Sequence, residues 1–382
     1  MLNHNRFMQK ENDILKDENQ KLSYLVKLAQ ERIKDLSSSL QKMKVNVLPP
    51  ITVCNELVGQ KKIEKVVPFF ATTGKVTLDS IPLTLCENAS QIYAGQINGD
   101  ISLMKVNDNG QNSFYRFNGS LLNQQIDQDF GPISKVGDLR GHEGPVHSLQ
   151  SYKENSLTSV SLDSTLKIWD VETGKNQSYY INIPSVSHVV VNDTVMIANC
   201  SKNLVSVDTR DSNVSTMELE SSITSVASTS LGLLLGTSDG CLLLYDNRIN
   251  KAYQTLNITT AKLPISKISG KKNVTVTSFD GIIRVLGNEL PIYVEKEFAR
   301  SPTNGSIIGS CIISLPDDDF VISGSTNGKA MVWKSSGQIQ TLQHSGSCVY
   351  DTIPLCDYLG TFITCDDSKH ITMYARSFEQ YS

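Results

Sequence analysis

Three residues of this chain could form a hydrolase-type catalytic set, namely His142, Ser159 and Asp163. In such a set the serine is the nucleophile, the histidine removes its proton and the aspartate orients the histidine. The sequence around Ser159, however, has neither a nucleophile-elbow motif nor a motif for an oxyanion hole. We therefore expect these side chains, together with Trp169, to form a buried hydrogen-bonded chain that stabilises the fold. No catalytic residue is predicted.

Other kinds of chemistry find little support in the sequence. Asp317–Asp319 could hold a divalent cation, but a run of like charges between two strands is more often solvated. No glycine-rich phosphate loop occurs, and the six histidines lack the close spacing of a metal site. We therefore expect no metal and no cofactor. Eight cysteines without a Cys-x-x-Cys pair are interpreted as buried apolar side chains: Cys54, Cys86, Cys200, Cys241, Cys311, Cys348, Cys356 and Cys365.

Charge and composition indicate the class of protein. The 382 residues include 35 basic and 39 acidic ones, which are interspersed and sum to a net charge of -4. This balance gives no field that would recruit nucleic acid, so no nucleic-acid partner is expected. The sequence lacks both an apolar run of about 18 residues and a secretion signal, which predicts a cytoplasmic protein. Lys61, Lys62 and Lys65 form a short basic group that we keep as a candidate membrane contact.

Residues 1–43 carry a heptad pattern. Apolar residues and asparagines recur at the a and d positions, which lie on one face of a helix. An isolated helix would leave that stripe in water, so we expect a coiled coil, and the asparagines favour a parallel homodimer. A lone amphipathic helix packed on the globular part is the alternative. The predicted dimer seam consists of Asn12, Leu15, Asn19, Leu22, Val26, Ile33, Leu36 and Leu40.

Further along, the chain repeats a hairpin pattern with a period of about 40 residues, which is the sequence signature of a propeller blade. The clearest copy is LTSVSLDSTLKIWD at 157–170, which reads as a strand, a turn and a second strand. Seven such copies predict an all-β, seven-bladed β-propeller, because a blade buries both of its faces only between neighbours. The large residues that close the second strand of each copy are Met104, Trp169, Val207, Tyr245, Leu286, Trp333 and Tyr374.

The turns of these hairpins are assigned structural roles. An Asp or Asn followed by Gly tolerates the positive φ that a tight turn requires. Asp239 and Asp280 are such turn residues, and Trp333 is the closing residue of the sixth copy. In the seventh copy, which ends on Tyr374, we count one extra residue in the turn.

Three segments follow from these patterns. We assign the coiled coil to 1–43, a linker to 44–62 and the propeller to 63–378. The linker contains Pro49 and Pro50, which end any helix because proline lacks the amide hydrogen and clashes with the preceding turn.

Two further features concern how the ring is built. A polar, glycine-rich stretch at about 107–137 predicts an exposed insertion between blades one and two. The sequence ends soon after the last copy, so the outer strand of blade seven should come from Lys65–Thr72, just before blade one. Such a strand would close the ring and remove its open sheet edges.

Both parts of the chain resemble one family. The Gly-His head at 141–142 and the Trp-Asp end at 169–170 are those of WD repeats. The heptads at 12–22, followed by QERIKDLSSSLQKM, resemble the end of the coiled coil in the autophagy-related protein 16 family, whose members in animals, plants and some protists carry WD repeats behind it. The segments at 164–175 and 314–347 are similar to the propeller of that family.

This resemblance implies a dimeric scaffold that makes and breaks no bond. Family members bring the ubiquitin-like twelve–five conjugate to the phagophore membrane, where a second ubiquitin-like protein is joined to phosphatidylethanolamine. In the family a helix that binds the autophagy five protein precedes the coiled coil, whereas here the heptads start almost at Met1, which leaves open how that partner is held. The alternative is another coiled-coil WD-repeat adaptor, such as a transcriptional co-repressor, an organelle-fission adaptor or a ubiquitin-ligase subunit.

Overall fold

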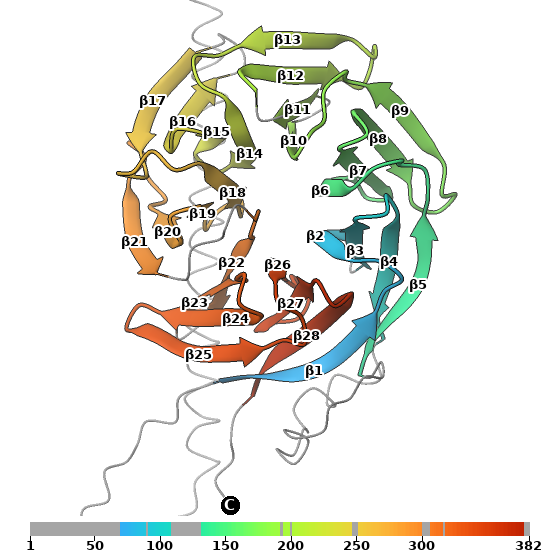
Figure 1. Ribbon diagram of the computed structural model, residues 1–382, viewed down its shortest axis with the longest axis vertical. Coiled ribbons are helices and arrows are strands. Elements are labelled where there is room, and N and C mark those ends of the chain that lie inside the picture. Colours follow the sequence, from blue (N-terminus) through green and yellow to red (C-terminus); the bar gives the residue numbers. More distant parts are fainter. Residues whose placement is uncertain are drawn as a thin grey trace, which may run out of the picture. The chain divides into compact units, whose positions relative to one another are not determined.

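The structure is a computed structural model that describes residues 69–88, 91–107, 131–191, 194–198, 201–246, 251–299, 306–315 and 318–377. These residues belong to one compact unit, Val66–Ser382. They form seven four-stranded antiparallel sheets arranged as blades around an axis (Figure 1). The all-β, seven-bladed propeller predicted from the repeats is therefore confirmed. Within the described ranges no helix is long and apolar enough to cross a membrane.

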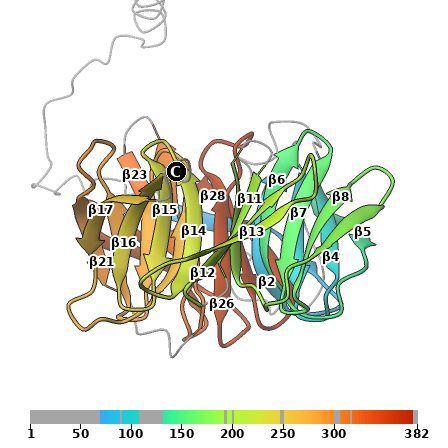
Figure 2. The same ribbon diagram turned by 90° about the horizontal axis from the view of Figure 1, so that it is seen from above.

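Each blade has an innermost strand near the axis and three strands that follow outward. Seen from the side, the strands run between the two faces of the ring (Figure 2). The strands of blades one to three are β2 (Pro82–Asn88), β3 (Gln91–Gln96), β4 (Ile101–Val106), β5 (Ile133–Leu139), β6 (Val146–Lys153), β7 (Ser156–Ser161), β8 (Thr165–Asp170), β9 (Asn176–Tyr180), β10 (Ser187–Val191), β11 (Thr194–Ala198), β12 (Asn203–Asp208) and β13 (Val214–Glu218).

Blades four to six continue the same order, and blade seven ends on a strand from the start of the described chain. Their strands are β14 (Ile223–Thr229), β15 (Gly232–Thr237), β16 (Cys241–Asp246), β17 (Lys251–Asn257), β18 (Ile265–Ser269), β19 (Thr275–Ser278), β20 (Ile282–Leu286), β21 (Val294–Ala299), β22 (Ser310–Leu315), β23 (Asp318–Ser323), β24 (Lys329–Lys334), β25 (Gly337–Gln343), β26 (Val349–Pro354), β27 (Thr361–Asp366), β28 (His370–Ser377) and β1 (Phe69–Thr77).

The predicted closing residues lie on the third strand of all seven blades, and each is at most 3% exposed. Each packs against the preceding blade. Trp169 of blade two, for example, lies in one apolar cluster with Tyr93 and Ile101 of blade one. The repeat detected in the sequence is therefore the contact surface between neighbouring blades, which no single blade could bury alone.

The ring is closed by β1, which pairs antiparallel with β28 as the outer strand of blade seven. The prediction of a closing strand from this region is confirmed, although the strand spans Phe69–Thr77 rather than Lys65–Thr72. Phe70 packs edge-on against Phe320 and Phe362, with ring centroids 5.3 and 5.1 Å away. The Gln340 side chain of blade six also bonds both the N–H and the C=O of Phe70, at 2.8 and 2.7 Å.

Two expectations about the blades are wrong. The end of the insertion predicted between blades one and two belongs to blade one, because Ile133–Leu139 is the outer strand of that blade and pairs with β4. Residues 108–130 of the predicted insertion lie outside the described ranges. The seventh turn has no extra residue. Phe362 opposes Tyr374 as Leu157 opposes Trp169, and both pairs are separated by the same number of residues. The seventh copy therefore corresponds to the second copy from Phe362 onward, and Thr361 lies before the repeated pattern.

The turns also agree in conformation. Ser164 and Lys369 occupy the same turn position in blades two and seven, with φ of 64° and 68°. Gly99 takes φ of 90° at this position in blade one, where a Cβ would collide with the carbonyl of His142. A left-handed residue at this point lets the two strands pair closely.

The predicted coiled coil at 1–43 and its seam, the linker at 44–62, and Lys61, Lys62 and Lys65 lie outside the described residues. They stay predictions.

Candidate functional site on the top face of the propeller

We call top face the face that carries the turns between the second and third strands and the connections between blades. In blade two, His142 comes from such a connection, Asp163 from such a turn, and Ser159 and Trp169 from the strands between them. His142 Nδ1 donates to Asp163 Oδ2 at 2.7 Å, and His142 Nε2 accepts from Ser159 Oγ at 2.7 Å. Trp169 Nε1 donates to the same hydroxyl at 2.8 Å.

The hydroxyl of Ser159 in this chain of hydrogen bonds is inaccessible to a substrate. Ser159 and Trp169 are fully buried and His142 is 6% exposed, so no substrate reaches the hydroxyl. Burial lowers the pKa of His142, an effect that the Asp163 carboxylate partly opposes. Burial also raises the pKa of Asp163, but its hydrogen bonds from Thr165 and His142 outweigh this and lower the pKa overall. The geometry is that of a structural network holding turn, connection and blade together.

Blade seven contains a second network that the sequence patterns did not predict. His344 Nδ1 donates to Asp366 Oδ2 at 3.1 Å, and His344 Nε2 accepts from the Tyr374 hydroxyl at 3.1 Å. Thr364 Oγ1 lies 3.4 Å from the same nitrogen. The signal was a histidine upstream of a Ser/Thr position and a tyrosine in the closing column. The pattern of blade two does not reveal this network, because Asp366 sits at the position of Ser161, two residues before the position of Asp163.

The other predicted structural residues serve different local contacts. Asp239 of blade four accepts from the hydroxyls of Thr237 and Ser221. Asp280 of blade five pairs with Arg284, a guanidinium only 4% exposed, at 2.8 Å. Trp333 closes blade six and packs near Phe298, with ring centroids 6.0 Å apart. The sequence predicted the turn acids but not the buried Arg284, which stands at the strand position of Lys167 and binds the turn acid that His142 binds in blade two.

Near the axis, seven equivalent positions on or beside the innermost strands form what we call the axial ring. Each position pairs with the residue of the second strand that lies nine residues before the closing residue of its blade. Its members, from blade one to blade seven, are Thr84, Ser148, Ser187, Ser225, Lys267, Gly309 and Asp351.

Several members of the axial ring connect their blade to the next. Ser187 Oγ accepts the N–H of Val226 at 3.1 Å, and Ser225 Oγ accepts the N–H of Ile268 at 3.0 Å. These N–H groups lie on the inner edge of the next blade. A buried, unpaired N–H costs about 1–3 kcal/mol. By accepting from these N–H groups, the two hydroxyls stabilise the contact between neighbouring blades.

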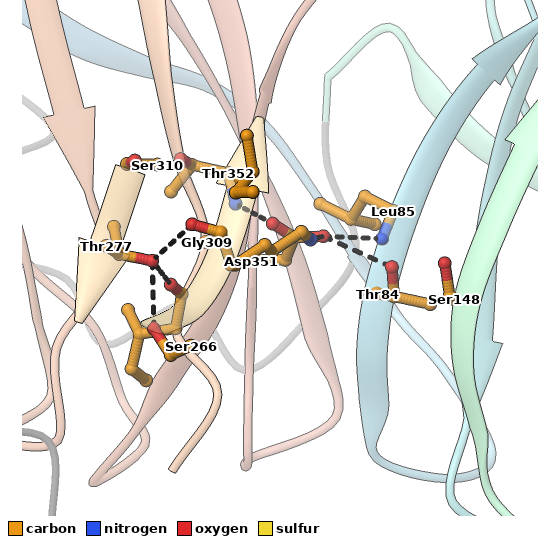
Figure 3. A network of polar contacts seen from close by, with 12 residues as sticks. Thr84, Leu85, Ser148, Ser266, Thr277, Gly309, Ser310, Asp351 and Thr352 are labelled. Atoms are coloured by element: carbon orange, nitrogen blue, oxygen red, sulfur yellow. Dashed lines mark hydrogen bonds and ion pairs between the residues drawn. The ribbon is translucent and has the colours of Figure 1, made fainter. Parts of the chain in front are cut away.

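Asp351 has the same role between blades seven and one. Its Oδ2 accepts the N–H of Leu85 at 3.0 Å and the hydroxyl of Thr84 at 3.3 Å (Figure 3). Lys267 of blade five also reaches this carboxylate, with Nζ 2.6 Å from Oδ2. The lysine passes blade six, where the ring position is Gly309. A Cβ on Gly309 would collide with Asp351 Oδ1, so this residue type makes the cross-ring pair possible.

The top face also exposes apolar side chains at one recurrent turn position. Ile97 is 46% exposed, Leu162 is 39% exposed, and Phe279 is half-buried. The backbone N–H of each donates to the carbonyl of the residue just before the innermost strand of the same blade, so each turn is tied to the connection that enters its own blade. Exposed apolar groups on a rigid frame are typical of protein-binding surfaces.

Two further sequence interpretations are only partly met. Of the described cysteines, Cys311, Cys348 and Cys365 are buried, Cys86 and Cys241 are half-buried and Cys356 is exposed. Among the predicted acidic run, Asp318 forms an ion pair with Lys334 at 3.0 Å and Asp317 lies outside the described ranges. The described residues contain no cluster of three or more metal-ligating side chains.

A family model for the WD domain, G-beta repeat, matches residues 133–170 and 300–334. Both matches end on the third strand of a blade, at Trp169–Asp170 and Trp333–Lys334. The ring is a WD40 propeller. The outer strand Ile133–Leu139 opens the first match, as expected for a WD40 repeat that spans two neighbouring blades.

Solved structures share this fold widely, and 1515 of their chains match. One is the crystal structure of the Myceliophteria thermophila Cps50 (Swd1) beta-propeller domain, with a TM-score of 0.63 and 14% sequence identity over 80% of this chain and 99% of that one. At this identity the likeness shows the fold alone. No curated protein matches the sequence.

Proposed function

We propose that this protein is a non-catalytic, dimeric scaffold in autophagosome formation. In this proposal it brings the ubiquitin-like twelve–five conjugate to the phagophore membrane and promotes lipidation of the autophagy ubiquitin-like protein there. The WD40 propeller binds a protein partner with its top face, residues 1–43 form the homodimer, and Lys61, Lys62 and Lys65 contact the membrane.

The distribution of polar and apolar groups on the propeller carries the scaffold role. The residues that could do chemistry, His142 and Ser159, are buried and bonded to each other. Ile97, Leu162 and Phe279 are instead accessible on a rigid face. Such a surface suits protein binding better than catalysis.

The direction of the closing strand is compatible with a partner bound on the top face. Thr77 at the end of β1 pairs with His370, beside a top-face turn, whereas Phe69 at its start pairs with Ser377 at the other end of β28. The strand β1 therefore begins at the face opposite the top face and ends beside the top face. The autophagy assignment itself rests on the resemblance of 12–43, 164–175 and 314–347 to the autophagy-related protein 16 family.

Affinity purification of the tagged full-length protein from starved cells tests this function. We expect the twelve–five conjugate to co-purify with the wild type and to be lost when residues 1–43 are deleted, with a soluble propeller remaining. Wild-type lipidation in cells that hold only the deletion variant would contradict the proposal. Accumulation in the nucleus, or on mitochondria, without the conjugate would instead favour a co-repressor or a fission adaptor.

The homodimer has its own test. Replacing Val26, Ile33 and Leu40 together by Asp puts charges into the predicted seam, and analytical ultracentrifugation should then show monomers. The matched control is Tyr24→Asp with Ser38→Asp, at positions that face away from the seam, which should remain dimeric. A dimer that survives the triple substitution would reject the seam.

A further inference from the structure

A cleft between blades five and six opens on the face opposite the top face, which we call the bottom face. Its polar rim lies at the bottom ends of the strands, because Asn288 follows β20, Glu295 lies near the start of β21, Asp319 lies near the start of β23 and Ser335 follows β24. Its floor consists of buried or half-buried apolar residues, namely Val285, Leu286, Phe298, Ile312 and Val321. An apolar floor with a polar rim is the usual composition of a protein-binding site.

Contacts between the two blades hold the walls of this cleft in place. Asn273, which lines the cleft from blade five, donates from Nδ2 to Ser314 Oγ of blade six at 2.7 Å. Phe298 of the floor packs near Trp333 of blade six, with ring centroids 6.0 Å apart. The cleft is therefore formed before a ligand arrives, which reduces the ordering that binding requires.

The space in the cleft suits one short apolar side chain. Its volume is about 60 Å³, and because one water molecule needs about 10–15 Å³ of such space, about four groups of that size fit. A leucine, isoleucine or methionine side chain has this size. Such a side chain would cover floor residues that the protein itself leaves open to the cleft, and burial of apolar surface favours binding.

The rim carries one negative charge that no cation of the described residues neutralises. Glu295 pairs with Lys296 at 3.4 Å, and Asp318, next to the cleft, pairs with Lys334 at 3.0 Å. Asp319 is exposed, and within the described part of the chain its carboxylate has neither a hydrogen bond nor an ion pair. The charge that remains at the rim therefore favours a cationic group on a ligand.

The sheet of blade six places this carboxylate beside the floor. Asp319 faces Ser314 across the ladder, and Val321 faces Ile312 two residues further along. Residues two apart on a strand point to the same side of the sheet and lie about 7 Å from each other. An apolar side chain in the cleft and a basic side chain next to it in the same ligand can thus be bound together.

Apolar surface continues outside the cleft. Gly287 lies between the lining residues Leu286 and Asn288, and a Cβ on Gly287 would collide with the ring of Tyr293. This ring therefore lies beside the cleft, and Tyr293 is 46% exposed. A ligand with a second apolar contact is favoured, which describes a peptide segment better than a small ion.

We propose that the cleft between blades five and six binds a peptide segment of a protein partner. An aliphatic side chain of the segment occupies the cleft, an adjacent Lys or Arg pairs with Asp319, and a further apolar side chain packs on Tyr293. The site goes beyond the proposed function, because it is a second interaction surface on the face opposite the top face and does not depend on the partner bound there.

A displayed library of random 12-residue peptides tests the site. The library is first depleted on immobilised Asp319→Lys protein, which reverses the charge at the rim and leaves the top face unchanged, and is then selected on the full-length wild type. We expect the recovered peptides to contain Leu, Ile or Met next to Lys or Arg. In fluorescence anisotropy, exchanging the aliphatic residue for Ala should weaken binding roughly tenfold to a hundredfold, and exchanging the basic residue for Gln roughly twofold to fivefold.

Variants of the protein assign the binding to the cleft. Asp319→Asn should weaken binding roughly twofold to fivefold and reduce its dependence on salt. Ile312→Trp fills the cleft and should abolish binding, with circular dichroism as the check that the propeller is folded. Asp319→Asn changes only the exposed rim, so it tests the site even if Ile312→Trp does not fold. The matched control is Asp211→Asn, an exposed aspartate of the bottom-face turn between β12 and β13, which should bind like the wild type.

Two results would overturn the proposal. One is a library that yields no binder after depletion, or binders indifferent to both Asp319→Asn and Ile312→Trp. The other is a set of binders that need the cleft but contain no basic residue, because the assigned occupant would then be wrong. The co-purification test of the autophagy function uses none of these variants, so the two outcomes are separable.

Discussion

Blades two and seven hold a buried histidine at the same place by different means. In blade two, the Ser159 hydroxyl donates to His142 and accepts from Trp169, so it links the imidazole ring to the indole ring. In blade seven, the Tyr374 hydroxyl bonds His344 directly. The position of the histidine is therefore maintained by the geometry of the turn and the strands rather than by one set of residue types.

The two blades also differ in how they are completed. The four strands of blade two follow one another in the chain, whereas blade seven takes its outer strand from β1. A defect in the outer strand should therefore be local in blade two but should open the whole ring in blade seven.

The largest effect is expected for Phe70→Ala, which removes the aromatic ring between Phe320 and Phe362. Truncating a fully buried aromatic side chain costs about 3–5 kcal/mol, and here it also loosens the closing strand. Chemical denaturation should show the loss in the free energy of unfolding. The control is Tyr180→Ala on the outer strand of blade two, where the side chain is 67% exposed. If both variants lost equal stability, the special role of β1 would be refuted.

An intermediate effect separates the two histidine networks. Trp169→Phe removes both buried volume and the donor to Ser159, which should cost about 2–3 kcal/mol. Tyr374→Phe removes only a hydroxyl, and burial, with a contribution from Asp366, raises the pKa of that tyrosine so that the group is neutral. Its loss should cost about 0.5–1.5 kcal/mol. Thermal unfolding of both variants measures the difference, and a reversed order would contradict the assigned contacts.

The smallest effect concerns pH and the contact between blades two and three. His188 is buried between Ser148 and Thr158, and burial lowers its pKa to about 3. Below the ordinary histidine pKa of about 6.5, the unfolded chain binds a proton that the folded chain excludes, so stability falls as the pH falls. Between pH 7 and 5.5 this amounts to about 1 kcal/mol.

The variant His188→Gln should lower the stability at pH 7 but remove that share of the pH dependence. Denaturation curves at the two pH values give the slope for each protein. Burial also lowers the pKa of His142 and His147, so a smaller slope should remain in the variant. An identical slope in both proteins would show that His188 takes up a proton in the folded state.

The parts of the fold that recur with the blade could be predicted from the sequence. The closing residues, from Met104 to Tyr374, were all placed correctly because each ends the second strand of the same hairpin pattern. The network of His142 was predicted because it follows the repeat pattern, and the closing strand because one blade lacked a fourth strand.

Contacts that break the period were missed. Asp366 stands two residues away from the expected turn position, and the turn acid Asp280 is bound by Arg284 of its own blade rather than by a histidine. The pair of Lys267 and Asp351 connects blades that are not neighbours, and it depends on the missing side chain of Gly309. No pattern within one repeat contains such information, because it arises from the three-dimensional closure of the ring.

The closing strand finally sets an order of events during synthesis. Thr73 of β1 bonds Met373 of β28, which lies 300 residues later. A ribosome that adds about 5–20 residues per second therefore releases β1 well before its partner exists. Until β28 has been made, β1 and β27 each have an unpaired strand edge, and such edges can pair with other chains. The last strand to emerge thus converts an open, association-prone arc into a protected ring.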